Sequence, residues 1–180
     1  MATKAKQDGA DKLRTAIRDV PDFPKPGIIF KDITPILSDA ALFKIAIDIL
    51  CNRHNGKRID KIAAIDARGF LFAGAMCDRL NVGLVPIRKK GKLPYKTFEQ
   101  SYDLEYGSAA LSIHQDAFKT GDRVVLVDDL LATGGTAAAS ASLIEKAGGK
   151  VVEIDFIVEL AFLNGRAKLP NYSVFAPIVF

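Results

Sequence analysis

Short apolar runs alternate with helical patterns along most of this chain, and this alternation constrains the fold more than any other feature of the sequence. The apolar runs cover residues 62–65, 82–87, 123–127 and 151–158, and the main helical patterns between them cover residues 70–80 and 136–147. Short strands without polar alternation are typical of parallel sheets that helices cover on both faces. The sequence therefore predicts an α/β fold with a mainly parallel, twisted sheet flanked by helices.

The N-terminal residues predict a small hood ahead of this core. Residues 1–10 are polar and predict a frayed arm, whereas Leu13, Ile17 and Val20 have the spacing of a short amphipathic helix. Three prolines between residues 21 and 26 predict a stiff loop.

The length of 180 residues predicts a single domain. Within it we expect the hood at about residues 11–37 and the core at about residues 38–180. A helix capped by Ser38 or Asp39 is expected next, because apolar residues recur at helical spacing from Leu42 to Leu50.

The composition excludes several classes of protein. Lys and Arg number 25 and Asp and Glu 21, so the net charge of +4 fits a small anionic ligand and is too weak to indicate nucleic acid. Cys51 and Cys77 exclude a disulfide scaffold and suit buried apolar positions. His54 and His114 lie far apart in the sequence, so we expect no zinc site. No secretory signal or membrane span is predicted, which favours a soluble cytoplasmic protein.

The segment from Arg123 to Thr136 carries the strongest functional signal. A buried strand ends at two acids, Asp128 and Asp129, and a Thr-Gly-Gly-Thr loop then leads into a helix. Glycines let the backbone close around an anion at a helix N-terminus, and ligands of open α/β sheets bind at the carboxyl ends of strands. The loop therefore predicts a phosphate site, and the acids suit a sugar diol, directly or through a divalent cation. A helix cap and a tight turn would explain either feature alone, but not their combination.

A basic stretch and a hairpin pattern follow one another in the middle of the chain. Five cations lie between residues 88 and 96, with no acid before Glu99. Taken alone, this stretch is either a solvated loop or a clamp for an anionic ligand. Residues 101–106 and 110–113 alternate around Gly107-Ser108, which predicts a β-hairpin.

The segment around Asp128 resembles the signature with which type I phosphoribosyltransferases bind phosphoribosyl pyrophosphate. Four further blocks are similar to the adenine branch of this family, at residues 23–32, 67–72, 88–94 and 102–107. The likeness runs from about Leu13 to the C-terminus. It implies the type I phosphoribosyltransferase fold, with a small N-terminal hood and a flexible β-hairpin loop. It also implies that adenine N9 attacks C1 of phosphoribosyl pyrophosphate, so that AMP forms and pyrophosphate leaves, with Mg²⁺ as cofactor.

The resemblance assigns the contacts to phosphate and ribose. The 5′-phosphate is expected on Ala132, Thr133, Gly134, Gly135 and Thr136. The 2′- and 3′-hydroxyls are expected on Asp128 and Asp129. Since neighbouring strand residues point to opposite faces, both acids reach the sugar only where the strand is already turning; otherwise one of them has another task.

The resemblance also places the pyrophosphate. Asp66, Ala67 and Arg68 are similar to the family's pyrophosphate loop, in which a cis peptide bond is expected between Asp66 and Ala67. Arg68 is expected to serve the pyrophosphate, the base or both.

Further expectations concern the basic stretch and the loop after it. The resemblance favours the clamp, formed by Arg88, Lys89 and Lys92, and implies a homodimer in which Arg88 reaches the partner's site. Residues 93–110 match the family's mobile catalytic loop.

The remaining assignments concern the base. Glu105 is expected to handle a proton at adenine N7 or N9, and Tyr106 to cover the site. An ordinary hairpin strand, with Glu105 facing solvent, is the alternative. Ile29 would offer backbone groups to the adenine edge, Phe30 would stack on its face, and Lys31 would contact base or phosphate. Phe30 also suits a plain core position.

Three other functions remain open. A phosphoribosyltransferase for xanthine, guanine or a pyrimidine would share the ribose phosphate site and differ in the hood. A regulator that senses phosphoribosyl pyrophosphate would need a DNA-binding domain, and only about 20 residues precede the prolines. A binding module without activity is disfavoured by Arg68, Glu105, Asp128 and Asp129. We expect no nucleic acid or membrane partner.

Overall fold

The chain divides into two units, Met1–Arg53 and His54–Phe180. The computed structural model describes residues 2–103 and 108–180 of the 180. The first unit extends beyond residue 37, where the sequence placed the end of the hood.

The first unit contains helices and a short β-hairpin. Its elements are α1 (Ala2–Ala16), β1 (Arg18–Pro21), β2 (Ile29–Asp32), α2 (Thr34–Ser38) and α3 (Ala40–Arg53). Asp39 is the cap of α3, since its Oδ1 accepts hydrogen bonds from the N–H groups of Ala41 at 2.8 Å and Leu42 at 3.0 Å. The prediction of a capped helix from this point is confirmed.

Two predictions for the first unit are wrong. Residues 2–10 belong to α1 rather than to a frayed arm. A contact between helices explains this, because a Cβ built at Gly9 would lie 3.2 Å from Ile45 Cγ2 of α3, so that α1 extends along its neighbour. Val20 does not continue the helix but lies in β1 opposite Phe30, where strand pairing takes precedence over the helical spacing.

The second unit contains the alternation of strands and helices that the sequence predicts. Its first half consists of β3 (Lys61–Ile65), α4 (Gly69–Leu80), β4 (Gly83–Lys89), β5 (Thr97–Asp103) and β6 (Ser108–His114). Its second half consists of β7 (Arg123–Val127), β8 (Leu130–Leu131), α5 (Gly135–Lys146), β9 (Lys150–Asp155), β10 (Val158–Glu159), β11 (Val174–Phe175) and β12 (Ile178–Val179), with 3₁₀ turns at Ala161–Leu163 and Gly165–Lys168.

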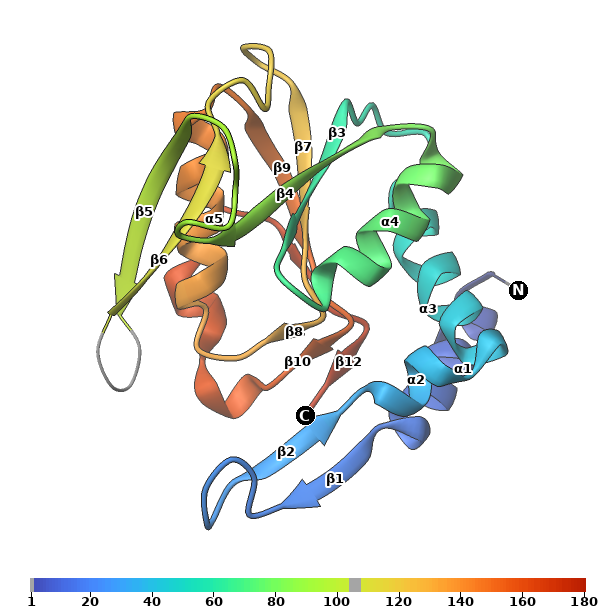
Figure 1. The fold of residues 1–180 in the computed structure, drawn as a ribbon. Coiled ribbons are helices and arrows are strands. Elements are labelled where there is room, and N and C mark those ends of the chain that lie inside the picture. Colours follow the sequence, from blue (N-terminus) through green and yellow to red (C-terminus); the bar gives the residue numbers. More distant parts are fainter. Residues whose placement is uncertain (1, 104–107) are drawn as a thin grey trace. The chain divides into compact units, whose positions relative to one another are not determined.

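The main sheet has the strand order β11-β9-β7-β3-β4-β6-β5 in the described part of the chain (Figure 1). The pairs from β11 to β4 are parallel, and β6 and β5 add an antiparallel edge. A smaller parallel sheet has the order β12-β10-β8. The prediction of a mainly parallel sheet is confirmed.

Helices cover both faces of the main sheet. The side chains of Val124 and Leu126 form one buried cluster with Leu143 and Ile144 of α5. Helix α4 packs on β3, β4 and β7. The crossovers through α4 and α5 step in opposite directions from the centre of the sheet, and right-handed crossovers then place the two helices on opposite faces. This doubly wound arrangement leaves the carboxyl ends of the central strands open for a ligand.

The strand predictions need two adjustments. The antiparallel pairing of β5 with β6 is confirmed, although Ser108 already belongs to β6 and residues 104–107 lie outside the described residues. Strand β5 begins at Thr97, within a stretch that shows no period in the sequence. The apolar run 151–158 is two strands, because the chain leaves the main sheet after Asp155 and β10 joins the small sheet.

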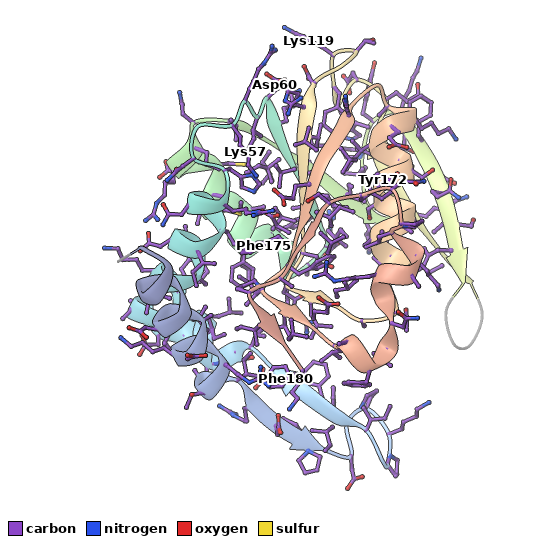
Figure 2. The ribbon with its side chains drawn as sticks, turned by 180° about the vertical axis from the view of Figure 1, so that it is seen from behind. Lys57, Asp60, Lys119, Tyr172, Phe175 and Phe180 are labelled. Atoms are coloured by element: carbon purple, nitrogen blue, oxygen red, sulfur yellow. The ribbon has the colours of Figure 1, made fainter. Side chains whose placement is uncertain are left out.

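The two cysteines occupy the buried positions that the sequence predicts. Cys51 and Cys77 are buried thiols and are not joined in a disulfide. Tyr172 lies beside α5 (Figure 2) and its hydroxyl donates to Glu145 Oε1 at 3.1 Å. Among the described helices, none combines the length and the apolar character that crossing a bilayer requires.

Candidate functional site

The carboxyl ends of β3 and β7 lie side by side, because the two strands are parallel neighbours with Ala64 opposite Val127. The turn of residues 66–68 follows β3, and the acid pair Asp128-Asp129 follows β7. Segments about 60 residues apart in the sequence therefore meet at one edge of the sheet, where an open α/β fold binds its ligand.

The turn after β3 approaches the acid pair closely. The peptide bond between Asp66 and Ala67 is cis, which confirms the prediction for this loop. Arg68 Nε lies 2.6 Å from Asp129 Oδ2. A Cβ at Gly69 would lie 2.8 Å from the carbonyl oxygen of Val127, so glycine is required for the start of α4 to come this near to β7.

The two acids have different surroundings. The strand ends at Val127 and the chain bends at Asp129, so the alternation of a strand no longer holds at the two acids. Asp129 is buried, with 4% of its surface exposed, and forms an ion pair with Arg68. Asp128 lines a hollow beside the glycine loop, and its Oδ1 accepts a hydrogen bond from the Asp129 N–H at 2.9 Å.

The electrostatics of Asp128 are unfavourable for its ionised form. Burial raises the pKa of the Asp128 carboxyl well above its usual range, and the negative charge of Asp129 raises it further. The hydrogen bond from the Asp129 N–H and the positive charge of Arg68 only partly oppose this rise in the pKa. A carboxylate held this way is stabilised by a ligand that donates hydrogen bonds to it.

The glycine loop connects the acid pair to α5. Gly134 has a φ of +79°, in the left-handed region that favours glycine, and α5 begins at the next residue. Residues 135–138 contain no acid, so the positive end of the helix dipole and its free N–H groups remain available to an anion. The adjacent hollow of about 320 Å³ opens to solvent, and Thr133, Gly134 and Thr136 contribute to its wall.

A second glycine supports this loop from outside the predicted segment. A Cβ at Gly165 would overlap with the carbonyl oxygen of Ala132, and one at Gly134 would overlap with that of Gly165. Arg166 fixes the supporting turn through Nη2, 2.7 Å from Oε2 of the buried Glu159. The hydrogen bonds to Glu159 raise the pKa of Arg166. The sequence analysis missed this support, although Asn164-Gly165 is a common turn dipeptide that could have indicated it.

Arg88 connects the basic stretch to the turn after β3. Its Nε donates to Asp66 Oδ2 at 3.0 Å, and its Nη1 donates to the carbonyl oxygen of Lys92 at 3.1 Å. The side chains of Lys89 and Lys92 are exposed. Lys90 forms an ion pair with Glu99, 2.7 Å from Nζ to Oε2.

The expected base contacts lie in the first unit. Ile29 is 57% exposed, and the ring of Phe30 meets Phe23 edge-on, with centroids 5.2 Å apart. Lys31 Nζ donates to Asp19 Oδ1 at 2.6 Å. Glu105 and Tyr106 lie outside the described residues.

Known proteins resemble this chain over nearly its whole length. Residues 33–174 match the model of the phosphoribosyl transferase domain. The adenine phosphoribosyltransferase of Geotalea daltonii is 53% identical over 170 residues, which are 94% of this chain and 99% of that protein. The chain belongs to the adenine phosphoribosyltransferase family.

Solved structures of adenine phosphoribosyltransferases have the same fold. The crystal structure from Thermoanaerobacter pseudethanolicus is 53% identical, with a TM-score of 0.92 over 95% of this chain and 99% of that one. The structure from Saccharomyces cerevisiae is 41% identical, with a TM-score of 0.90 over 94% of this chain and 98% of that one. It is a complex with adenine and D-2,5-dideoxy-2,5-imino-altritol 1,6-bisphosphate.

In this member of the adenine phosphoribosyltransferase family, most of the residues predicted to bind phosphate and ribose lie close together. Asp66, Arg68, Arg88 and the segment 128–136 meet at the carboxyl ends of β3 and β7. The residues predicted to contact the base are in the other unit or outside the described residues.

Proposed function

We propose that this chain transfers the 5-phosphoribosyl group from phosphoribosyl pyrophosphate to adenine, giving AMP and pyrophosphate, and so serves purine salvage. The observation that carries the proposal is the 53% identity to an adenine phosphoribosyltransferase across 94% of this chain and 99% of the relative. The paired carboxylates beside an anion-binding loop supply the groups that this substrate needs.

The glycine loop suits the 5′-phosphate of the substrate. Free N–H groups at the start of α5 and the hydroxyls of Thr133 and Thr136 are donors for phosphate oxygens. Asp128 and Asp129 are assigned to the ribose hydroxyls, and each charge-assisted hydrogen bond contributes about 1.5–3 kcal/mol. Asp129 has a second task here, because its ion pair orients Arg68.

The pyrophosphate is assigned to the turn of residues 66–68 and to the basic stretch. In the reaction the bond from adenine N9 to C1 forms, the bond from C1 to the pyrophosphate oxygen breaks, and N9 loses its proton. Negative charge grows on the leaving group, and we assign Arg68, Lys89 and Lys92 to stabilise it. Arg88 orders the turn through Asp66. We further propose a homodimer, in which Arg88 reaches the partner's site in addition to its contact with Asp66 of its own chain.

The residues beside the loop fit a magnesium ion. Mg²⁺ prefers oxygen ligands and is usually held by one or two carboxylates together with substrate phosphates. Asp128 lines the hollow and offers carboxylate oxygens to such an ion, whereas the buried carboxylate of Asp129 is paired with Arg68. Mg²⁺ carried by the pyrophosphate and the ribose hydroxyls would supply positive charge to the leaving group.

Base recognition is assigned to the hood and to the loop of residues 93–110. Backbone groups of Ile29 would read the adenine edge, Phe30 would stack on its face, and Lys31 would contact base or phosphate. Glu105 would take up or deliver the proton at N7 or N9, and Tyr106 would cover the site. A mobile loop over the site excludes water, which would otherwise hydrolyse the activated ribose. We expect the enzyme in the cytoplasm.

One assay tests the proposed function. The protein is incubated with Mg²⁺, phosphoribosyl pyrophosphate and adenine, hypoxanthine, guanine, xanthine or uracil, and nucleotide formation is followed. AMP from adenine is expected at a rate far above the other products. Absence of AMP contradicts the proposal, and preferential formation of another nucleotide assigns a different base.

Glu105→Gln tests the role of the acid. Loss of the proton acceptor should lower kcat by about 100-fold or more and change KM for adenine much less. The reverse pattern would make Glu105 a binding residue only.

A further inference from the structure

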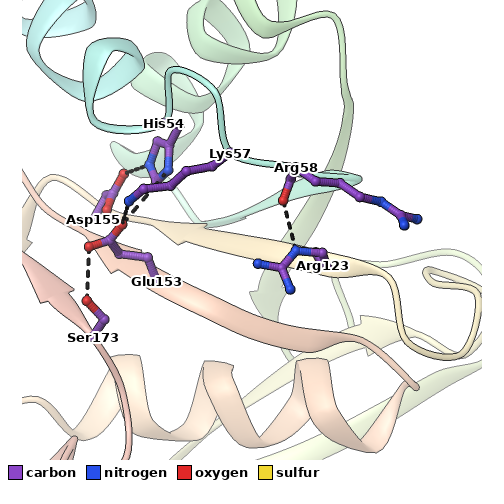
Figure 3. Close-up of polar contacts among 7 residues, drawn as sticks. All are labelled: His54, Lys57, Arg58, Arg123, Glu153, Asp155 and Ser173. Atoms are coloured by element: carbon purple, nitrogen blue, oxygen red, sulfur yellow. Dashed lines mark hydrogen bonds and ion pairs between the residues drawn. The ribbon is translucent and has the colours of Figure 1, made fainter.

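Three buried polar side chains form a cluster that the proposed reaction does not use. His54, Glu153 and Asp155 are 2%, 3% and 0% exposed. His54 Nε2 lies 2.5 Å from Asp155 Oδ2, and Glu153 contacts Lys57 Nζ at 3.1 Å and the Ser173 hydroxyl at 3.0 Å (Figure 3). Since Ile154 belongs to the cluster packed on α5, the two acids that flank it point to the opposite face of β9.

The residue types suit a metal ion, but the contacts indicate a hydrogen-bonded network. The ligand atoms of His54, Glu153 and Asp155 lie within 4.8 Å of one another. Two ligands of one tetrahedral zinc, each about 2.0 Å from the ion, are more than 3 Å apart, whereas His54 and Asp155 are in direct contact at 2.5 Å. The ammonium group of Lys57 already supplies positive charge at Glu153.

Asp155 connects this cluster to the acid pair through the backbone. It is the last residue of β9, and its carbonyl oxygen accepts a hydrogen bond from the Asp128 N–H at 3.1 Å. The N–H groups of Ile157 and Val158 both donate to the carbonyl oxygen of Asp129 at 3.0 Å. The main chain that carries both carboxylates is thus attached to residues 155–158.

We propose that His54, acting through Asp155, is a positioning residue for the Asp128-Asp129 pair. The inference rests on the proposed function, in which these acids hold the ribose. A buried hydrogen bond between an imidazole and a carboxylate fixes the end of β9, and the main-chain bonds transmit this position to the acids. Small displacements of groups that orient a substrate reduce rates strongly, so a residue without substrate contact affects the reaction by this route.

Substitution of His54 tests the proposal in the full-length enzyme. His54→Leu removes the hydrogen bond to Asp155, and His54→Gln retains an amide donor near the position of Nε2. Lys57→Met is the matched control, because it removes a contact of the same cluster that involves Glu153 rather than Asp155. All variants are assayed at a temperature at which circular dichroism shows them folded.

We expect His54→Leu to raise KM for phosphoribosyl pyrophosphate by about tenfold and to leave KM for adenine within about twofold. His54→Gln should restore most of the loss, and Lys57→Met should resemble the wild type. An unchanged KM for phosphoribosyl pyrophosphate in His54→Leu overturns the proposal, as does an equal effect of Lys57→Met.

Amide hydrogen exchange gives a second readout that needs no activity. The Asp128 amide should exchange at least about tenfold faster in His54→Leu, while the amides of Val125 and Leu126 keep their wild-type rates. Equal exchange at Asp128 in both proteins overturns the proposal.

If His54→Leu is unfolded, His54→Asn takes its place. If both variants are unfolded, His54 is a determinant of the fold, and this result also overturns the proposal. If the wild-type protein forms no AMP, the proposed function is contradicted. The hydrogen-exchange result then still decides whether His54 positions Asp128.

Discussion

Asp60 and Asp128 adjoin opposite ends of β7, and their surroundings have opposite effects on a carboxylate. At the start of the strand, Asp60 Oδ2 accepts a hydrogen bond from the Arg123 N–H at 2.9 Å, and Arg58 Nε lies 3.1 Å from Oδ1. The backbone hydrogen bond from Arg123 is the main cause that lowers the pKa of Asp60. At the other end, burial and the charge of Asp129 raise the pKa of Asp128.

The contrast separates a carboxylate that serves the fold from one for which we propose a role in ligand binding. The ionised form of Asp60 has partners within the chain, so its charge stabilises the native state. The ionised form of Asp128 lies beside a second acid, and the hydrogen-bond donors of a sugar diol would stabilise it. Sites that bind ligands often retain such unfavourable local electrostatics.

The largest effect is expected on catalysis at the ligand end of β7. Asp128→Asn should lower kcat/KM for phosphoribosyl pyrophosphate about ten- to hundredfold, the loss of one charge-assisted hydrogen bond of about 1.5–3 kcal/mol. Asp60→Asn is the matched control at the other end and should retain activity within about twofold. Steady-state kinetics measure both, and equal losses would remove the distinction between the two ends.

A somewhat smaller effect is expected from the glycine that supports the phosphate loop. The Cβ of Gly165→Ala overlaps with the Ala132 carbonyl, so the loop must shift and KM for phosphoribosyl pyrophosphate should rise by about tenfold. Gly74→Ala is the control, since in the described chain nothing lies within 4 Å of a Cβ at that helical position. It should stabilise the protein by up to about 1 kcal/mol without changing KM. A normal KM in Gly165→Ala would show that the loop adapts.

The raised pKa of Asp128 predicts a pH-dependent difference in stability. Between the ordinary pKa of an aspartate, near 4, and the raised pKa in the folded protein, unfolding releases a proton, so Asp128 destabilises the native state increasingly as pH rises. Asp128→Asn lacks this contribution. The unfolding free energy of the variant, relative to wild type, should therefore increase with pH across that window in urea titrations. A difference that is independent of pH would contradict the raised pKa.

The smallest effect is expected at Asp60. Its lowered pKa contributes stability that is present above about pH 4 and is lost as pH falls through the folded-state value. Asp60→Asn should be slightly less stable than wild type at neutral pH, and the two should converge in acid. Acid unfolding followed by circular dichroism measures this, and a constant difference down to pH 2 would argue against a role for the Asp60 charge.

The proposed phosphate site rests on local patterns in the sequence. The strand, acids and glycine loop are contiguous from Arg123 to Thr136, so their spacing alone indicates a site. The parallel sheet could also be predicted, because the alternation of strands and helices is a local pattern along the sequence. The family resemblance supplied the turn of residues 66–68, whose cis peptide bond the structure confirms.

Contacts between distant segments could not be predicted in this way. His54 meets Asp155 across 101 residues, and Gly165 meets the loop at Ala132 after four intervening elements, α5, β9, β10 and a 3₁₀ turn. No periodicity connects such positions, because the sheet order that joins them emerges only when the chain has folded. The same limit explains why residues 2–10 of α1 were not predicted to be helical. These polar residues lack an apolar stripe, and their helix extends along α3.

The most direct test of the distinction between the two ends of β7 is thermal unfolding of wild type and Asp128→Asn at pH 7.5, with and without AMP. Without AMP, the variant should unfold at the same temperature as wild type or at a higher one. With AMP at about 100 times its dissociation constant for wild type, wild type should gain about 2.7 kcal/mol and the variant clearly less. A variant that is less stable without AMP, yet gains as much from AMP as wild type, would show that Asp128 serves the fold rather than the ligand.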